Sequence, residues 1–110
     1  MKIALVSDAY FDMCSTTSSH IAAALKGFQK LGHEVRIFTS DVNTKRTVVE
    51  DDFVAFPGVP SYSRAAQGVK VSSLLSISSY LDDFAPDIIH VFTFTMLSYM
   101  AVSYAIKNDI

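Results

Sequence analysis

Residues 20–40 decide the fold, and they read HIAAALKGFQKLGHEVRIFTS. Apolar side chains recur in this stretch at steps of three and four, the spacing of an amphipathic helix, and they are Ile21, Ala24, Leu25, Phe28 and Leu31. Ser18 or Ser19 is expected to cap the start of the helix, and Gly32 to end it in a left-handed conformation. EVRIFTS, over residues 34–40, then indicates a strand.

The residues before this stretch supply its partner strand. KIALVS, over residues 2–7, is apolar and nearly continuous, as expected of a parallel strand that is covered on both faces. Strand, helix and strand therefore follow one another in about forty residues and predict a βαβ unit. The pairing in such a unit is parallel and its crossover is right-handed.

The remaining chain continues the alternation of strands and helices. The expected elements are a loop over 41–47, one or two short strands in VV and FVAF around Glu50-Asp51-Asp52, a loop over 57–64, a helix over 71–84 that ends before Pro86, a strand over 87–92 and a helix over 95–107. The fold class is therefore α/β, a Rossmann-like open and mainly parallel sheet with flanking helices. Such sheets bind ligands at the carboxyl ends of their strands, so the loops over 8–18, 40–47 and 92–96 are the candidate ligand loops.

Composition narrows the class of protein. The chain has 110 residues, 50% of them hydrophobic, which suits one ordinary domain with a core. A net charge of −2 argues against binding to nucleic acid. One cysteine, Cys14, and the absence of a signal-peptide pattern predict a cytoplasmic protein. Residues 88–106 carry no charged side chain, but their pattern indicates a strand followed by a helix rather than a membrane span.

Four stretches in this order resemble the N-terminal domain of family 4 glycosyltransferases, which are retaining enzymes of the two-domain GT-B fold. They are MKIALVSDAYF at 1–11, residues 20–40, PSYSR at 60–64, and FAPDIIHVFTFTMLSYMAVSYA at 84–105. The resemblance implies transfer of a sugar from a nucleotide sugar, with a UDP-sugar favoured, to a lipid or sugar acceptor that this domain holds.

The resemblance also implies what the 110 residues lack. The remaining strands of the domain and the donor-binding domain, with its paired glutamates and basic residues, are absent from the sequence. We therefore expect residues 1–110 to be a partial acceptor-side domain without transferase activity of its own.

The family's glycine pair after the first strand falls here on Ser15 and Thr16. In one interpretation their hydroxyl groups replace backbone amides as donors beside a helix N-terminus, which is an anion site. In the other, the run of hydroxyl residues is a solvated loop with one serine as the helix cap. His20, in the first turn, either bonds substrate as in the family or lies on the helix flank.

After its fourth strand the family commonly has a histidine, an apolar residue and a second histidine that points into the cleft. This chain has His90-Val91-Phe92, so the second histidine is lost. Alternation along a strand puts residues 90 and 92 on one face. Phe92 can neither exchange a proton nor donate a hydrogen bond, and we expect Phe92 and Thr93 to contact substrate.

Three further residues resemble substrate contacts. Tyr62 and Arg64 match a cleft-lining loop in family members that act on lipids, where an arginine could clamp a phosphate, although a surface arginine explains the pattern equally. Asp8 follows the first strand and either contacts substrate or accepts backbone amides in its loop. Asp82, Asp83 and Asp87 are interpreted as solvated turn residues.

No metal site and no cofactor are expected, because the histidines and carboxylates lack ligand spacing and there is no GxGxxG or Walker lysine. A second hypothesis is a non-catalytic Rossmann-like module that pairs with another chain or with itself through an open sheet edge. A third is a flavodoxin-like or nucleotide-binding domain. Peripheral contact with the inner face of the membrane is a further expectation, although the sequence shows no basic amphipathic helix.

Overall fold

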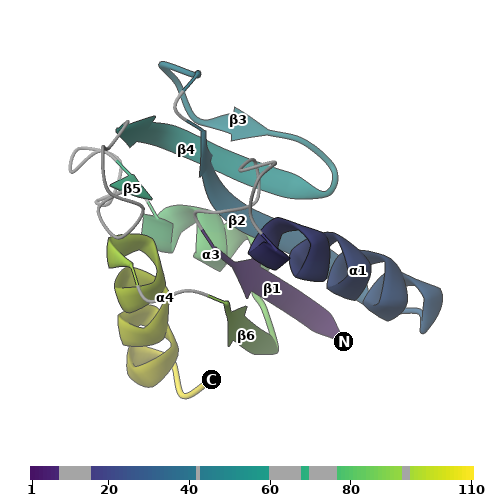
Figure 1. The fold of residues 1–110 in the computed structure, drawn as a ribbon. Coiled ribbons are helices and arrows are strands. Elements are labelled where there is room, and N and C mark those ends of the chain that lie inside the picture. Colours follow the sequence, from purple (N-terminus) through teal and green to yellow (C-terminus); the bar gives the residue numbers. More distant parts are fainter. Residues whose placement is uncertain (8–15, 42, 60–67, 70–76, 93–94) are drawn as a thin grey trace.

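The computed structural model describes residues 1–7, 16–41, 43–59, 68–69, 77–92 and 95–110 (Figure 1). The elements are β1 (Lys2–Val6), α1 (Thr16–Lys30), β2 (Glu34–Asp41), β3 (Val48–Val49), β4 (Phe53–Val59), β5 (Gly68–Val69), α3 (Ile77–Phe84), β6 (Ile88–Val91) and α4 (Met96–Lys107). Strands and helices alternate as the sequence predicts, and the α/β class is confirmed. Among the described residues, no helix is both long and apolar enough to cross a membrane.

The sheet has the strand order β3-β4-β2-β1-β6, and β5 pairs in addition with β4. The pairs β1 with β2, β1 with β6, and β2 with β4 are parallel, whereas β3 and β5 run antiparallel to β4. The parallel strands therefore lie in the order third, second, first, fourth. The sheet is Rossmann-like and mainly parallel.

The strand β1 is covered on both faces, which explains its continuous apolar sequence. Its odd-numbered side chains, Ile3 and Leu5, pack in a core cluster with Ile21 and Leu25 of α1. Its even-numbered side chains pack in a second cluster with α3 and α4, through residues such as Leu81 and Leu97. The strand thus separates the two halves of the core (Figure 1).

The helix α1 differs from the prediction at both ends. It begins at Thr16, so Ser18 and Ser19 lie inside its first turns and neither is the expected cap. Leu31 lies beyond the helix and is 74% exposed, so its place in the apolar stripe was wrong. Gly32 does end the helix as predicted, with a left-handed φ of 89°.

Two further boundaries move. The strand β4 runs through Pro57 to Val59, so the loop predicted from residue 57 begins later. The helix α3 is described from Ile77, and the earlier residues of the predicted helix lie outside the described residues. Within α3, Leu81 and Phe84 are buried as predicted.

The strand β6 was predicted to be buried, and this was wrong for one of its faces. It forms the end of the sheet beside β1, with Ile88 44% exposed and His90 also exposed. Ile89 and Val91, on the opposite face, pack against the cluster under α3 and α4. Because the helix α1 covers β1 and β2 but leaves this face of β6 bare, its apolar sequence is only half covered.

Candidate functional site

The strand order contains one reversal, and it lies between β1 and β6. Among the parallel strands, β2 and then β4 follow β1 on one side. The next parallel strand, β6, lies on the other side of β1. Ligands of open α/β sheets bind at the carboxyl ends of the strands beside such a reversal. The carboxyl ends of β1 and β6 therefore form the candidate site, which is followed in the chain by α1 and α4 (Figure 1).

The two strand ends are held in register just past their last residues. The amide of Phe92 donates a hydrogen bond of 3.0 Å to the carbonyl oxygen of Val6. The amide of Ser7 donates one of 3.1 Å to the carbonyl oxygen of Phe38 in β2. Backbone bonds thus fix the rim of the site across three strands.

His90 and Phe92 form a stacked pair at this rim. Their ring centroids are 4.4 Å apart and their planes differ by 5°. Phe92 packs in addition against the cluster beneath α1, whereas His90 is exposed. The expectation that residues 90 and 92 share a face is confirmed, and the rim at β6 is a flat aromatic surface.

Sequence reasoning missed a polar residue at the end of β2. Thr39 is fully buried, and its Oγ1 atom has no hydrogen-bond partner. Alternation along β2 places Thr39 on the same face as Ile37, which packs beneath α1. No local signal in the sequence distinguishes this buried threonine from a solvated one at a strand end.

The beginning of α1 follows the site in the chain. Thr16 is its first residue, so residues 16–19 of the hydroxyl run form the first turn of the helix and do not belong to a loop before it. The unpaired amides of a helix N-terminus favour anions. His20 lies on this helix and is exposed beside the buried Ile21. Of the residues predicted to contact substrate, Phe92 lies at the carboxyl ends of β1 and β6. Thr16 begins the helix that follows β1 in the chain.

The other predicted site residues cannot be placed. Asp8, Ser15, Tyr62, Arg64 and Thr93 lie outside the described residues. Their substrate contacts stay predictions, and Cys14 lies outside as well.

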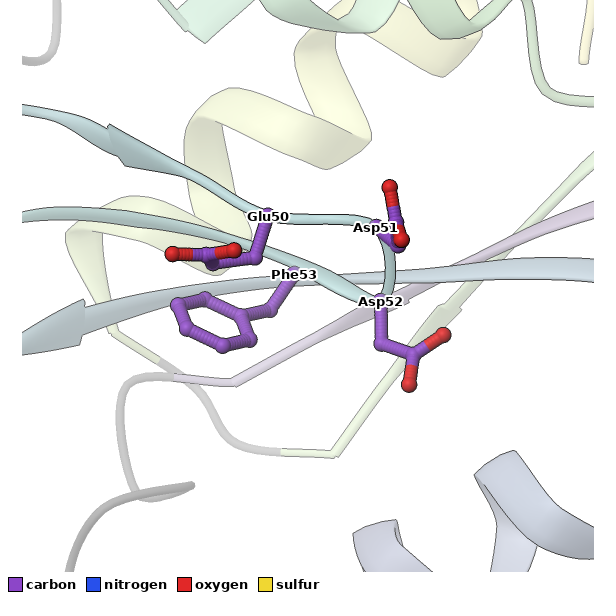
Figure 2. A pocket seen from close by; sticks show the side chains of 4 residues that line it. All are labelled: Glu50, Asp51, Asp52 and Phe53. Carbon is purple, nitrogen blue, oxygen red and sulfur yellow. The ribbon is translucent and has the colours of Figure 1, made fainter.

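Acidic side chains gather elsewhere, in the turn between β3 and β4. Glu50, Asp51, Asp52 and Phe53 line an open hollow of about 380 Å³ there. Figure 2 shows the three carboxylates pointing in different directions, and Asp52 accepts a hydrogen bond of 3.0 Å from Gln29 Nε2. The hollow lies at the amino end of β4, away from the candidate site. Within the described part of the chain, no group of three or more potential ligands could hold a metal ion.

The aspartates near α3 are all exposed, as predicted, but only Asp87 lies in the connection between α3 and β6. Asp82 and Asp83 lie in the last turn of α3, and Asp82 Oδ1 accepts a hydrogen bond of 2.6 Å from the hydroxyl of Tyr104. Asp87 precedes β6 and accepts a hydrogen bond of 2.7 Å from the amide of Lys2. Both carboxylates therefore tie elements together, and neither faces the candidate site.

A comparison with protein families agrees with this architecture. The model of Glycosyltransferase Family 4 matches residues 17–110, from the first turn of α1 to the last residue. The chain belongs to glycosyltransferase family 4. No curated protein matches the chain.

Membership in glycosyltransferase family 4 gives the chain a glycosyltransferase-related function. It also allows the rim at β6 to be compared with the pattern of the family. The family resemblance implies a histidine in the cleft where this chain has Phe92. The ring of Phe92 packs partly into the core and stacks on His90, so it offers an apolar contact in place of a titrating group. Phe92 therefore cannot transfer a proton at that position.

Proposed function

We propose that the chain is the acceptor-side domain of a family 4 glycosyltransferase, which takes part in sugar transfer from a nucleotide sugar to a lipid or sugar acceptor. The observation that carries the proposal is the strand reversal between β1 and β6, with the stacked His90 and Phe92 at its rim. Ligands of open parallel sheets bind at such a reversal. The family match supports a ligand that takes part in sugar transfer.

The acceptor is proposed to lie against the aromatic rim. Binding sites for small molecules are lined mainly by apolar and aromatic side chains, with few polar groups that fix orientation. The exposed face of His90 suits the apolar face of a sugar ring or the alkyl part of a lipid, and its ring nitrogens can bond hydroxyl groups. Asp8, Ser15, Thr16 and His20 are proposed to contact the same ligand from the β1 side, and Tyr62, Arg64 and Thr93 from neighbouring loops.

The donor, for which we favour a UDP-sugar, is proposed to bind mainly to a second domain. Transfer builds negative charge on the leaving diphosphate, and stabilising that charge is usually the largest catalytic contribution. In this proposal residues 1–110 position the acceptor, and a donor-binding domain supplies the charge stabilisation. The protein is proposed to act in the cytoplasm, without nucleic acid and with peripheral contact to the membrane when its acceptor is a lipid.

Nuclear magnetic resonance of the purified chain with an alkyl glucoside as acceptor probe tests the proposal. We expect the signals of His90 and Phe92 to shift, and Phe92→Ala to weaken binding about tenfold, because truncating a buried aromatic contact costs on the order of 1–2 kcal/mol. Val49→Ala is the control, since Val49 is exposed at the opposite end of the sheet. Signal changes confined to β3, or equal effects of the two variants, would refute the acceptor site.

A non-catalytic interaction module remains the second candidate function. The observation in its favour is the bare end of the sheet, where Ile88 is 44% exposed on a strand with no charged side chain. Sheet ends that do not associate are usually protected by charges, prolines or bulges. Failure to bind any sugar, together with stable association with another chain, would favour this module over the transferase domain.

A further inference from the structure

The helix α4 exposes a continuous apolar face. The described residues expose nine large hydrophobic side chains, and four of them lie on this one helix. These four form the α4 face, and they are Met96 (56% exposed), Tyr99 (66%), Val102 (44%) and Ile106 (77%). Their spacing of three, three and four residues places them on one side of the helix.

The opposite side of α4 is already used by the core. Leu97 and Ala101 are buried in the cluster beneath α3 and α4, with Met100 and Tyr104 packed at its margin. The helix is therefore apolar on both sides, and Lys107, its last residue, is its only charged one. Its exposed surface also includes Ser103, but large apolar side chains dominate it, which is unusual for a solvated helix face. Figure 1 shows α4 at the periphery of the molecule.

The size of the α4 face matches what a dimer needs. If each side chain presented roughly 200 Å², a value typical of aromatic residues and an upper figure for the other three, the four exposed fractions would correspond to at most about 500 Å² of surface. A standard interface buries about 800 Å² per partner, and about 56–65% of that area is apolar, which is roughly 450–520 Å². At this upper figure, the α4 face would supply the apolar part of a standard-sized interface.

The chemistry of the face favours a second copy as its occupant. An apolar stripe without charges is complementary to itself, which a twofold-symmetric contact requires. The net charge of −2 adds little repulsion between copies. A lipid surface is disfavoured, because helices that lie on membranes pair their apolar side with a polar side rich in lysine and arginine. We propose that the chain forms a symmetric homodimer in which the α4 faces of two copies pack together.

Sedimentation equilibrium of residues 1–110, from about 1 μM to about 1 mM, tests this proposal over the range of weak to moderate dimers. We expect a concentration-dependent dimer of the unmodified protein. Ile106→Glu and Tyr99→Glu are each expected to raise the dimer dissociation constant about tenfold or more, because they place a charge in a desolvated apolar contact. Circular dichroism of each variant establishes that it is folded.

Leu31→Glu is the matched control, because Leu31 is a large aliphatic residue of nearly equal exposure, 74%, outside the α4 face. It should leave the dimer unchanged. Ile88→Lys separates the α4 face from the end of the sheet: dissociation by this variant, with the α4 variants still dimeric, would overturn the proposal. A monomer at every concentration would also overturn it, as would binding of the monomer to phosphatidylcholine vesicles that is lost in Ile106→Glu.

Discussion

The hydroxyl of Tyr104 links α4 to α3. Burial raises its pKa first of all, and the hydrogen bond to Asp82 and the negative charge of that carboxylate raise it further, to about 12 from a usual value of 10.0. The folded protein thus holds the proton of this phenol more tightly than the unfolded chain does. The resulting stabilisation is complete below pH 10 and is lost as the pH rises toward 12.

Alkaline titration should therefore detect the raised pKa of Tyr104. Followed by ultraviolet absorbance, its ionisation should occur near pH 12 in the folded protein. Asp82→Asn removes the carboxylate charge and should lower the pKa of Tyr104 toward 10 while burial keeps part of the shift. Tyr104→Phe identifies the signal, because the late step should vanish with it. An unchanged late step in Tyr104→Phe would assign it to another tyrosine.

Individual site residues were predictable only where local geometry decides. Alternation along a strand placed His90 and Phe92 on one face, and their stacked rings bear this out. The exposure of His90 could not be predicted, because it depends on whether any other element covers β6. The burial of Thr39 was missed for the same reason, since a threonine at a strand end is compatible with a buried or a solvated position.

Glycines in and after α1 offer a paired test of helix chemistry. Gly27 lies within the helix and Gly32 just beyond it with φ 89°, and a Cβ atom at either position would meet nothing within 4 Å. A methyl group would therefore clash with no other residue at either position. The two positions differ only in their backbone conformation. Gly27→Ala should stabilise the fold by about 0.5–1 kcal/mol, because alanine favours the helix. Gly32→Ala should destabilise it by about 1 kcal/mol, because the left-handed conformation strains alanine.

Urea unfolding, followed by circular dichroism, measures both effects. The two midpoints should move in opposite directions from that of the unmodified protein. Movement in the same direction would mean that Gly32 does not adopt the left-handed conformation, or that α1 ends before Gly27.

The elements themselves were largely predictable, because their periodicities differ so clearly. Residues 2–7 are nearly continuously apolar, residues 34–40 contain the β-prone run Ile37-Phe38-Thr39, and residues 19–31 carry the three-to-four spacing, so β1, β2 and α1 all occur where expected. The errors fall at ends and edges. Leu31 continued the helical pattern but faces solvent, since a pattern does not record where the core stops. The short β5 pairs at Gly58 and Val59 of β4, a contact that no local signal indicates.

The assembled domain is predicted to bind without turning over substrate. We expect the purified chain to transfer no sugar from UDP-glucose or GDP-mannose to an alkyl glucoside. The physical reason is that groups which stabilise developing charge contribute about 10²–10³ in rate each, and the family resemblance assigns those groups to another domain. A radiolabelled donor provides the measurement. Detectable product, abolished by Phe92→Ala, would show that these residues form a complete active site.

The fold class of the whole molecule was predictable from the sequence, but the order of the strands in the sheet was not. The sequence of strands and helices indicates an open parallel sheet, and that class is confirmed. The place of β6 beside β1 rests on pairing between residues far apart in the chain, which no local pattern encodes. The family match over residues 17–110 agrees with the resemblance that the four stretches carry.

The central position of β1 has a consequence for biosynthesis. The amide of Lys2 donates a hydrogen bond to a carboxylate 85 residues later in the chain, so β1 is made well before its second neighbour, β6. At about 5–20 residues per second, a ribosome needs roughly 4–17 s to produce that neighbour. During this delay the β6 side of β1 stays unpaired in the nascent chain, and an open strand edge can pair with another chain. Release from the ribosome before β6 emerges would leave that strand open to aggregation.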